Sequence, residues 1–305
     1  MQDDSRRKEY LESLIQKRLP NSFMKSQTQE SFKYPKKWAN ISPCTEEMKE
    51  NFSKNFHPDQ HSKTATNHER KDHDSELISR NDHDLKLLQS VQLLISDRYS
   101  VNKQINAQVV LTKENLLKIP ADAIVNSANE ALLGGGGLDA IIHYYAGASL
   151  KDEIQLLPNV PNYDSYYYPV KCLTGSCVIT SGHNLPHPYI LHTVCPYLDE
   201  HGQPQPDLLI QCYQNILKYI DGEHISSIAI GALGTGYYGY PMVEAAILSL
   251  RVIREYLEFL QQQTHQGSLS LSSSSSIRII LSIPNEIHYE MHEILWKVFF
   301  PTELS

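Results

Sequence analysis

The sequence contains little cysteine. Five cysteines are spread over 305 residues, and no Cys-x-x-Cys pair occurs among them. An odd number of cysteines without paired spacing does not indicate a disulfide framework. We therefore expect free thiols in a reducing compartment.

Long apolar runs are also missing. No stretch reaches the roughly 20 apolar residues that a membrane-spanning helix needs. The first residues, MQDDSRRKEYLESL, lack the apolar core of a secretory signal. These features predict an intracellular protein, cytoplasmic or nuclear, without a membrane partner.

The chain has no excess of basic residues. Lys and Arg number 27 against 35 Asp and Glu, which gives a formal net charge of −8. This balance argues against general binding to DNA or to anionic membranes, although it allows a local basic pocket. The hydrophobic content of 41% is enough for one sizeable core plus an extension.

The first 100 residues differ in composition from the rest. Residues 1–20 have apolar side chains at helical spacing and end at Pro20, which predicts a short amphipathic helix. Residues 21–83 are polar with mixed charge, as is typical of irregular or disordered segments. Within them, His57 and His61 have a spacing that could hold a metal ion on a helix, but Pro58 and the polar surroundings favour solvated surface. Residues 84–97 again predict a helix, so we assign 1–100 to a partly helical extension and 101–305 to a domain.

Strand and helix patterns alternate through this domain. The alternation predicts an α/β fold with helices on both faces of one sheet. The predicted strands are 108–111, 123–126, 176–180, 189–194, 227–232 and 277–283. The predicted helices are 138–146, 150–157, 207–220, 243–262 and 287–299. A serine-rich run at 267–276 predicts a flexible loop without a catalytic role.

The most informative stretch is residues 122–147, DAIVNSANEALLGGGGLDAIIHYYAG. An apolar strand is followed by the amides Asn126 and Asn129, by four glycines, and by Asp139 at the start of a helical pattern. Backbone N–H groups in a glycine-rich loop at a helix start can bind phosphate. The glycines alone are equally consistent with a plain turn. The segment is neither a P-loop nor a dinucleotide-binding fingerprint.

A second glycine-rich loop, GTGYYGYP, occupies residues 234–241. It follows the apolar strand IAIGAL and precedes another helical pattern. Two such loops open at the same edge of one sheet, so together they can hold a diphosphate through backbone N–H groups. For either loop alone, an ordinary tight turn is the alternative.

These segments resemble the macrodomain family, and within it the MacroD-type ADP-ribosyl hydrolases. Residues 126–129, 134–139 and 142–143 follow the order and spacing of the family, as do the loop 234–239 and the segment 174–194. The resemblance covers roughly residues 105–300. It implies a three-layer α/β/α fold with a mixed central sheet and a site for ADP-ribose or an ADP-ribosylated protein. We expect no cofactor and no metal ion, because the glycine loop lacks the Cys that some zinc-holding macrodomains have there, and we expect a monomer.

The resemblance also assigns roles to residues. It places Asp139 on the catalytic acid and Asn129 on the asparagine that orients the distal ribose. The implied ligand-binding residues are Asn115, Leu116, Asn126, Gly135, Gly136, Gly137, Leu138, Gly234, Thr235, Gly236, Tyr237 and Tyr238.

Alternatives remain open for several of these residues. Asp139 suits a helix cap, and Asn126 suits a loop anchor that bonds to backbone. Tyr238 would either stack over the distal ribose or pack under its own loop. We expect His192, on the strand 189–194, to be structural.

The chain departs from the family at the adenine end. Where the family has Gly-Asp-Ile-Thr, with an aspartate that accepts from the adenine amino group, residues 114–117 read Glu-Asn-Leu-Leu, so Asn115 stands at the aspartate position. Pro284 and Asn285 stand where Phe-Asp is frequent. The ribose and diphosphate ends keep the family pattern.

Two classes of function follow from the resemblance. One is a hydrolase that removes mono-ADP-ribose from acidic side chains or deacylates O-acyl-ADP-ribose. The Gln-Glu-Glu pattern of poly(ADP-ribose) glycohydrolases does not occur. The other class is a module that reads ADP-ribose without turning it over.

Overall fold

The computed structural model describes residues 2–16, 85, 88, 99–163, 168–220, 224–265 and 277–302. The interpretations of 21–83, with the two spaced histidines, and of the serine-rich run at 267–276 lie outside the described residues. Of the helix predicted at 84–97, only Leu85 and Leu88 are described. Both have a helical backbone, and Leu88 is buried in the core.

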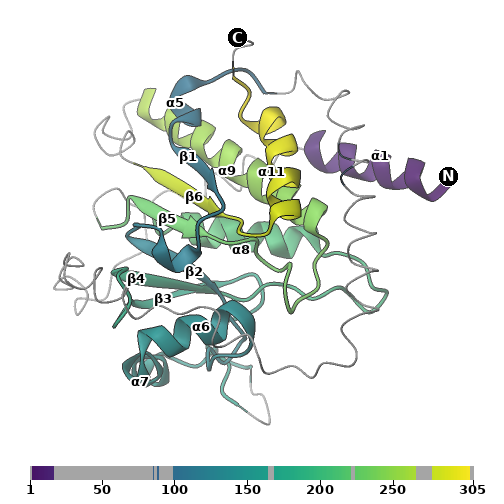
Figure 1. Ribbon diagram of the computed structural model, residues 1–305. Coiled ribbons are helices and arrows are strands. Elements are labelled where there is room, and N and C mark those ends of the chain that lie inside the picture. Colours follow the sequence, from purple (N-terminus) through teal and green to yellow (C-terminus); the bar gives the residue numbers. More distant parts are fainter. Residues whose placement is uncertain are drawn as a thin grey trace.

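A mixed sheet of six strands forms the centre of the described part of the chain (Figure 1). The strands are β1 (Val109–Thr112), β2 (Ala123–Ser127), β3 (Cys177–Ser181), β4 (Tyr189–Thr193), β5 (Ser227–Ile230) and β6 (Arg278–Ser282). Their order is β1-β6-β5-β2-β4-β3, with β3 antiparallel to β4 and the other neighbours parallel. The predicted α/β class and mixed sheet are confirmed.

Helices cover both faces of this sheet. Helices α6 (Gly137–Ala146) and α7 (Ala148–Leu156) contact β2 and β3. On the opposite face, α8 (Pro206–Leu217) packs on β3, β4 and α9 (Met242–His265), and α11 (Glu286–Phe299) packs on α9. Two short elements were not predicted, because they are too short to show a helical period of apolar residues. They are α5 (Lys103–Asn106) and the 3-10 helix η3 (Leu116–Lys118).

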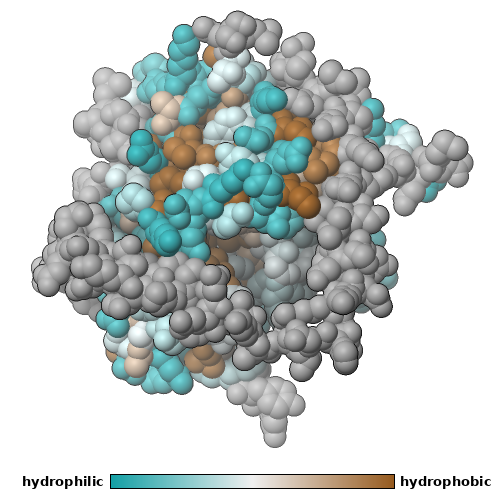
Figure 2. Space-filling model, in the orientation of Figure 1, coloured by the Kyte–Doolittle hydropathy of each residue, from teal (hydrophilic) through white to brown (hydrophobic). Residues whose placement is uncertain are grey.

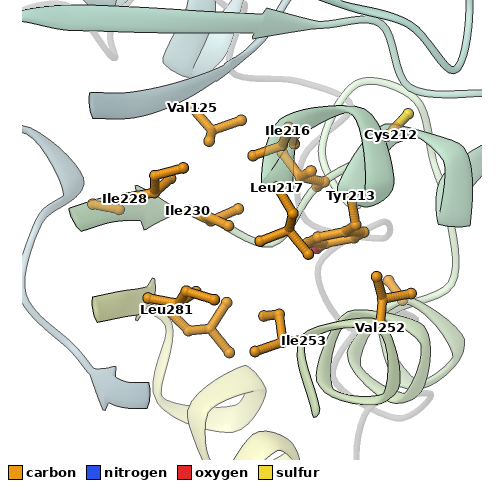
Figure 3. Close-up of a cluster of buried hydrophobic side chains, with 14 of the residues drawn as sticks. Val125, Cys212, Tyr213, Ile216, Leu217, Ile228, Ile230, Val252, Ile253 and Leu281 are labelled. Atoms are coloured by element: carbon orange, nitrogen blue, oxygen red, sulfur yellow. The ribbon is translucent and has the colours of Figure 1, made fainter. Parts of the chain in front are cut away.

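The main core lies between the sheet and α8 and α9. Figure 3 shows Val125 of β2 and Ile230 of β5 beside Ile216 of α8, and Leu281 of β6 beside Ile253 of α9. These side chains are fully or almost fully buried. Burying one such side chain contributes about 1.5–3 kcal/mol, so this layer fixes the strand register. Because strand residues alternate between faces, Asn126 lies on the other face, under α6.

The first helix, α1 (Gln2–Gln16), packs against α9. Leu11 and Ile15 are fully buried and belong to the same core as the sheet. Arg251 of α9 is also buried, and its Nη1 donates to the carbonyl of Leu14. The predicted N-terminal helix is therefore confirmed over residues 2–16, and its apolar side is covered by the domain.

The surface mixes polar and apolar side chains. Figure 2 shows hydrophilic residues across one face, with smaller groups of hydrophobic residues between them. In the part of the chain that the structure describes, no helix is both long and apolar enough to cross a membrane.

Candidate active site

Asp139 lies in the first turn of α6 and is almost completely buried. Its Oδ1 accepts a hydrogen bond of 2.7 Å from Nδ2 of Asn126, and its Oδ2 accepts one of 2.6 Å from the backbone N of Gly135. The carboxylate thus joins the end of β2 to the glycine loop. Capping is part of this arrangement, because Asp139 reaches back to a backbone N–H just before the helix. The cap position itself is Gly136, which has no side chain for that purpose.

Asn126 connects Asp139 to the sheet. Its Nδ2 lies 3.1 Å from Nδ1 of His192, and Nε2 of His192 lies 2.8 Å from Oγ1 of Thr180. Burial lowers the pKa of His192 to about 3, so the ring is neutral. Asn126 is fully buried, and its Oδ1 has no hydrogen-bond partner among the described residues. Both ring nitrogens of His192 therefore have a partner on a neighbouring strand. A structural rather than catalytic role for His192 stays a prediction.

His143 lies one helical turn after Asp139. Its Nε2 is 3.4 Å from Oδ1 of Asp139. Burial lowers the pKa of His143, and the charge of Asp139 acts in the opposite direction. The carboxylate is therefore approached by an amide, a backbone N–H and an imidazole.

The first glycine loop places Asn129 beside Asp139. A Cβ on Gly135 would lie 3.4 Å from Oδ2 of Asp139 and 3.5 Å from Nδ2 of Asn129, so both side chains flank this glycine. Oδ1 of Asn129 accepts from the backbone N of Leu133 at 3.3 Å, and its amino group lies on the side of Gly135. The exposed Gly136 and Gly137 follow, and a Cβ on either would meet no atom within 4 Å. The backbone at the start of α6 is therefore open.

The second glycine loop follows β5, the neighbour of β2. Gly234 has a φ of +78°, which explains why a glycine occupies this position. Oγ1 of Thr235 donates to the carbonyl of Ala232 at 2.8 Å, and a Cβ on Gly236 would meet no atom within 4 Å. Since β2 and β5 are parallel, their carboxyl ends place the two loops at one edge of the sheet.

Tyr238 joins the two loops directly. Its hydroxyl donates to the carbonyl of Ala128 at 2.6 Å, its side chain is buried, and burial raises its pKa. This contact corresponds to the packing alternative for Tyr238. Tyr237 is 85% exposed, and Tyr197, whose ring centroid lies 4.6 Å from that of Tyr238, is also exposed. Contact of Tyr238 with the distal ribose, and of Tyr237 with the ligand, stays a prediction.

Asn115 follows β1 at the same edge of the sheet. Its Oδ1 accepts from the backbone N of Leu117 at 3.0 Å and caps η3. The side chain of Leu116 is buried in the core, so a ligand contact from this residue would involve its backbone. Asn285 likewise caps α11 by accepting from the backbone N of His288. Leu138 lies 3.9 Å from the Cβ position of Gly231, between the two loops.

Metal-ligating side chains are not grouped here. Among the described residues, no three or more His, Cys, Asp or Glu side chains lie in a position to hold a metal ion together. The described cysteines are free thiols: Cys172, Cys177, Cys195 and Cys212.

Known proteins with similar sequences share this region. Residues 125–248 match the Macro domain family model. A macro domain-containing protein of Chlorobaculum tepidum is 37% identical over 152 residues, which are 50% of this chain and 81% of that protein. The chain belongs to the macrodomain family. Mouse ADP-ribose glycohydrolase MACROD1 is 40% identical over 164 residues, 53% of this chain and 46% of that protein, so this macrodomain chain spans about half the length of that relative.

Solved macrodomains have the same fold. The crystal structure of the macro domain of ganglioside induced differentiation associated protein 2 has a TM-score of 0.56 at 26% identity, covering 69% of this chain and 94% of that one. The Trypanosoma brucei macrodomain in complex with ADP has a TM-score of 0.50 at 30% identity, covering 63% and 70%.

Sequence reasoning missed two side chains of this macrodomain site. Thr180 looked like an ordinary strand residue, and His143 entered only as part of the family pattern. The spacing from Asp139 to His143, one helical turn, was a usable signal for the second. No local signal identified Thr180, because it reaches the site through His192 on another strand.

Proposed function

We propose that this protein hydrolyses the bond between mono-ADP-ribose and the acidic side chain of a modified protein, or deacylates O-acyl-ADP-ribose. The observation that carries this proposal is the buried Asp139 carboxylate beside Asn129, at the start of α6. The similarity to proteins named ADP-ribose glycohydrolase, and to a macrodomain solved with ADP, supports it.

In this proposal the two glycine loops bind the diphosphate. The open backbone at Gly136 and Gly137 begins α6, where unpaired N–H groups and the helix dipole favour an anion. Gly236 offers the same open approach from the second loop. Backbone donors supply this binding in place of a lysine or a metal ion.

Asp139 then positions the attacking water, helped by the phosphate of the substrate. A carboxylate oxygen has two lone pairs, so each oxygen can accept a bond from water besides the bond that it makes within the protein. Asn129 orients the distal ribose through its amino group. Water adds across the scissile bond, and the products are free ADP-ribose and the free carboxylic acid.

A reader module that binds ADP-ribose without turnover is the second candidate. The altered adenine end, where Asn115 replaces a carboxylate, is compatible with this candidate. Retention of both Asp139 and Asn129 favours the enzyme, since a reader has no use for a positioned acid–base group.

The test is single-turnover release of ADP-ribose from an automodified transferase. We expect Asp139→Ala to lower the rate by about 10²–10⁴ and to leave affinity for ADP-ribose within about tenfold. The control is Asp152→Ala, which removes an exposed carboxylate from α7. Wild-type turnover in the Asp139 variant would show that this residue only caps the helix, and binding without release by the wild type would favour the reader.

A further inference from the structure

We propose that His192 and Thr180 are positioning residues that orient the Asn126 amide toward Asp139. The chain of contacts runs from Ser181 through Thr180, His192 and Asn126 to Asp139, and its kinetic consequence rests on the function proposed above. None of these contacts requires a ligand.

The sheet register brings these side chains together. Asn126 of β2 and His192 of β4 are direct partners in a parallel pair, so both side chains point to the face under α6. On β3, Val178 is the partner of His192, and Thr180 lies two residues further on the same face. The resulting distances are 2.7 Å for Asn126 to Asp139, 3.1 Å for Asn126 to His192, and 2.8 Å for His192 to Thr180.

The direction of each hydrogen bond follows from the Thr180 hydroxyl, at the far end of this series of contacts. The hydroxyl of Thr180 donates to the carbonyl of Ser181 at 3.2 Å, so its Oγ1 accepts from Nε2–H of His192. A neutral imidazole with a proton on Nε2 has an acceptor at Nδ1. That acceptor takes one N–H of Asn126, and the Asp139 carboxylate takes the other. The reversed amide would place its oxygen against two acceptors.

The amide has no second anchor. Oδ1 of Asn126 is buried and has no partner among the described residues, so the two bonds of its amino group alone set its orientation. Loss of the acceptor at His192 removes one of them. The other titratable groups around this chain are His143, which faces Asp139, and His183 and Glu153, which bond to each other at 2.8 Å.

Matched substitutions test the proposal. Thr180→Val removes the hydroxyl at constant shape, and Thr180→Ser keeps it. His192→Leu removes the acceptor but fills the space, whereas His192→Asn keeps an oxygen near the position of Nδ1 and leaves a cavity. Thr264→Val is the control, since the hydroxyl of Thr264 bonds to the carbonyl of Leu260 in the last turn of α9.

We expect the single-turnover rate constant to fall about 10–100-fold in His192→Leu, the loss typical when a residue that holds a metal ligand in place is removed, with little change in ADP-ribose affinity. His192→Asn is expected to restore most of the rate although it is the less stable variant. Thr180→Val is expected to lower the rate several-fold, and Thr180→Ser to restore it. Rates that simply follow thermal stability across the set would overturn the proposal.

A second readout does not depend on turnover. Nitrogen-15 NMR of the wild type and of Thr180→Val reports which ring nitrogen of His192 carries the proton. We expect protonation on Nε2 alone in the wild type, and a mixture of tautomers in Thr180→Val. A wild-type ring protonated on Nδ1 would overturn the proposal. Protonation on Nε2 in a protein without turnover would contradict only the proposed hydrolysis.

Discussion

Docking of α1 on α9 can be tested by two substitutions. Leu11 and Ile15 are fully buried against the domain, while Glu9 and Gln16 on the same helix are exposed. Replacing a fully buried Leu or Ile by Ala costs about 2–5 kcal/mol. We therefore expect Leu11→Ala with Ile15→Ala to lower the free energy of unfolding by about 4 kcal/mol, the lower end of the sum, because α1 lies at the periphery and undocking limits the loss.

The size of the effect can be converted to temperature. For a domain of roughly 150–250 residues, 1 kcal/mol corresponds to about 2–4 °C in Tm. Differential scanning calorimetry should therefore show Tm lower by about 8–16 °C in the double variant. Glu9→Ala with Gln16→Ala is the matched control, and each of its exposed changes should stay within about 0.5 kcal/mol.

The rate of hydrolysis should not change with this loss of stability. The contacts of Asp139 do not include α1, so the single-turnover rate constant should equal that of the wild type well below Tm. A shorter protein that begins near Gln104 should also stay active, but it should melt earlier because Arg251 loses the carbonyl of Leu14. Equal Tm values for the core and control variants would refute docking of α1.

Three further predictions concern the ligand and pH. Gly236→Val should abolish binding of ADP-ribose without unfolding the protein, because its Cβ meets no protein atom within 4 Å, and calorimetry with unchanged affinity would contradict the diphosphate role. Asn115 uses its oxygen on Leu117, so the wild type should distinguish ADP-ribose poorly from its inosine counterpart, and Asn115→Asp should improve the preference about fivefold, as paired titrations can show. Burial lowers the pKa of His187 to about 4, of His192 to about 3 and of His292 to about 4, all below the ordinary 6.5. Their contribution to stability is thus fully present above about pH 6.5 and declines as the pH falls toward 4. Urea unfolding should show a loss of about 2 kcal/mol per histidine between pH 7.5 and pH 5, and equal stability at both values would contradict neutral burial.

The elements of the fold were largely predictable. Apolar runs such as 123–125 and long helical periods such as 243–262 carry strong local signals, and the structure matches them closely. The pairing of β1 with β6 has no such signal, since nothing near Val109 indicates a partner near Ile279. The mixed sheet was predicted only through the family resemblance.

The candidate site was predictable in part. Asp139, Asn129 and both glycine loops lie in patterns that can be recognised locally, and the structure places them at one edge of the sheet. The direction of Tyr238 was not predictable, because stacking on a ligand and packing under a loop require the same residue type. Thr180 could not be identified either, because its contribution depends on strand register rather than on its own neighbours.

The pairing of β1 with β6 has a consequence for the order of folding. Val109 can pair only after Ile279 has been synthesised, and α1 can pack only after α9 has been synthesised. The Asp139 contacts need only residues between β2 and β4, whereas Tyr238 closes on Ala128 much later in synthesis. Contacts of such long sequence separation carry a large loop-closure entropy and slow the search for the native state. A growing chain can therefore assemble the carboxylate half of the site first, while β1 and the second glycine loop join only when the distant strands have emerged.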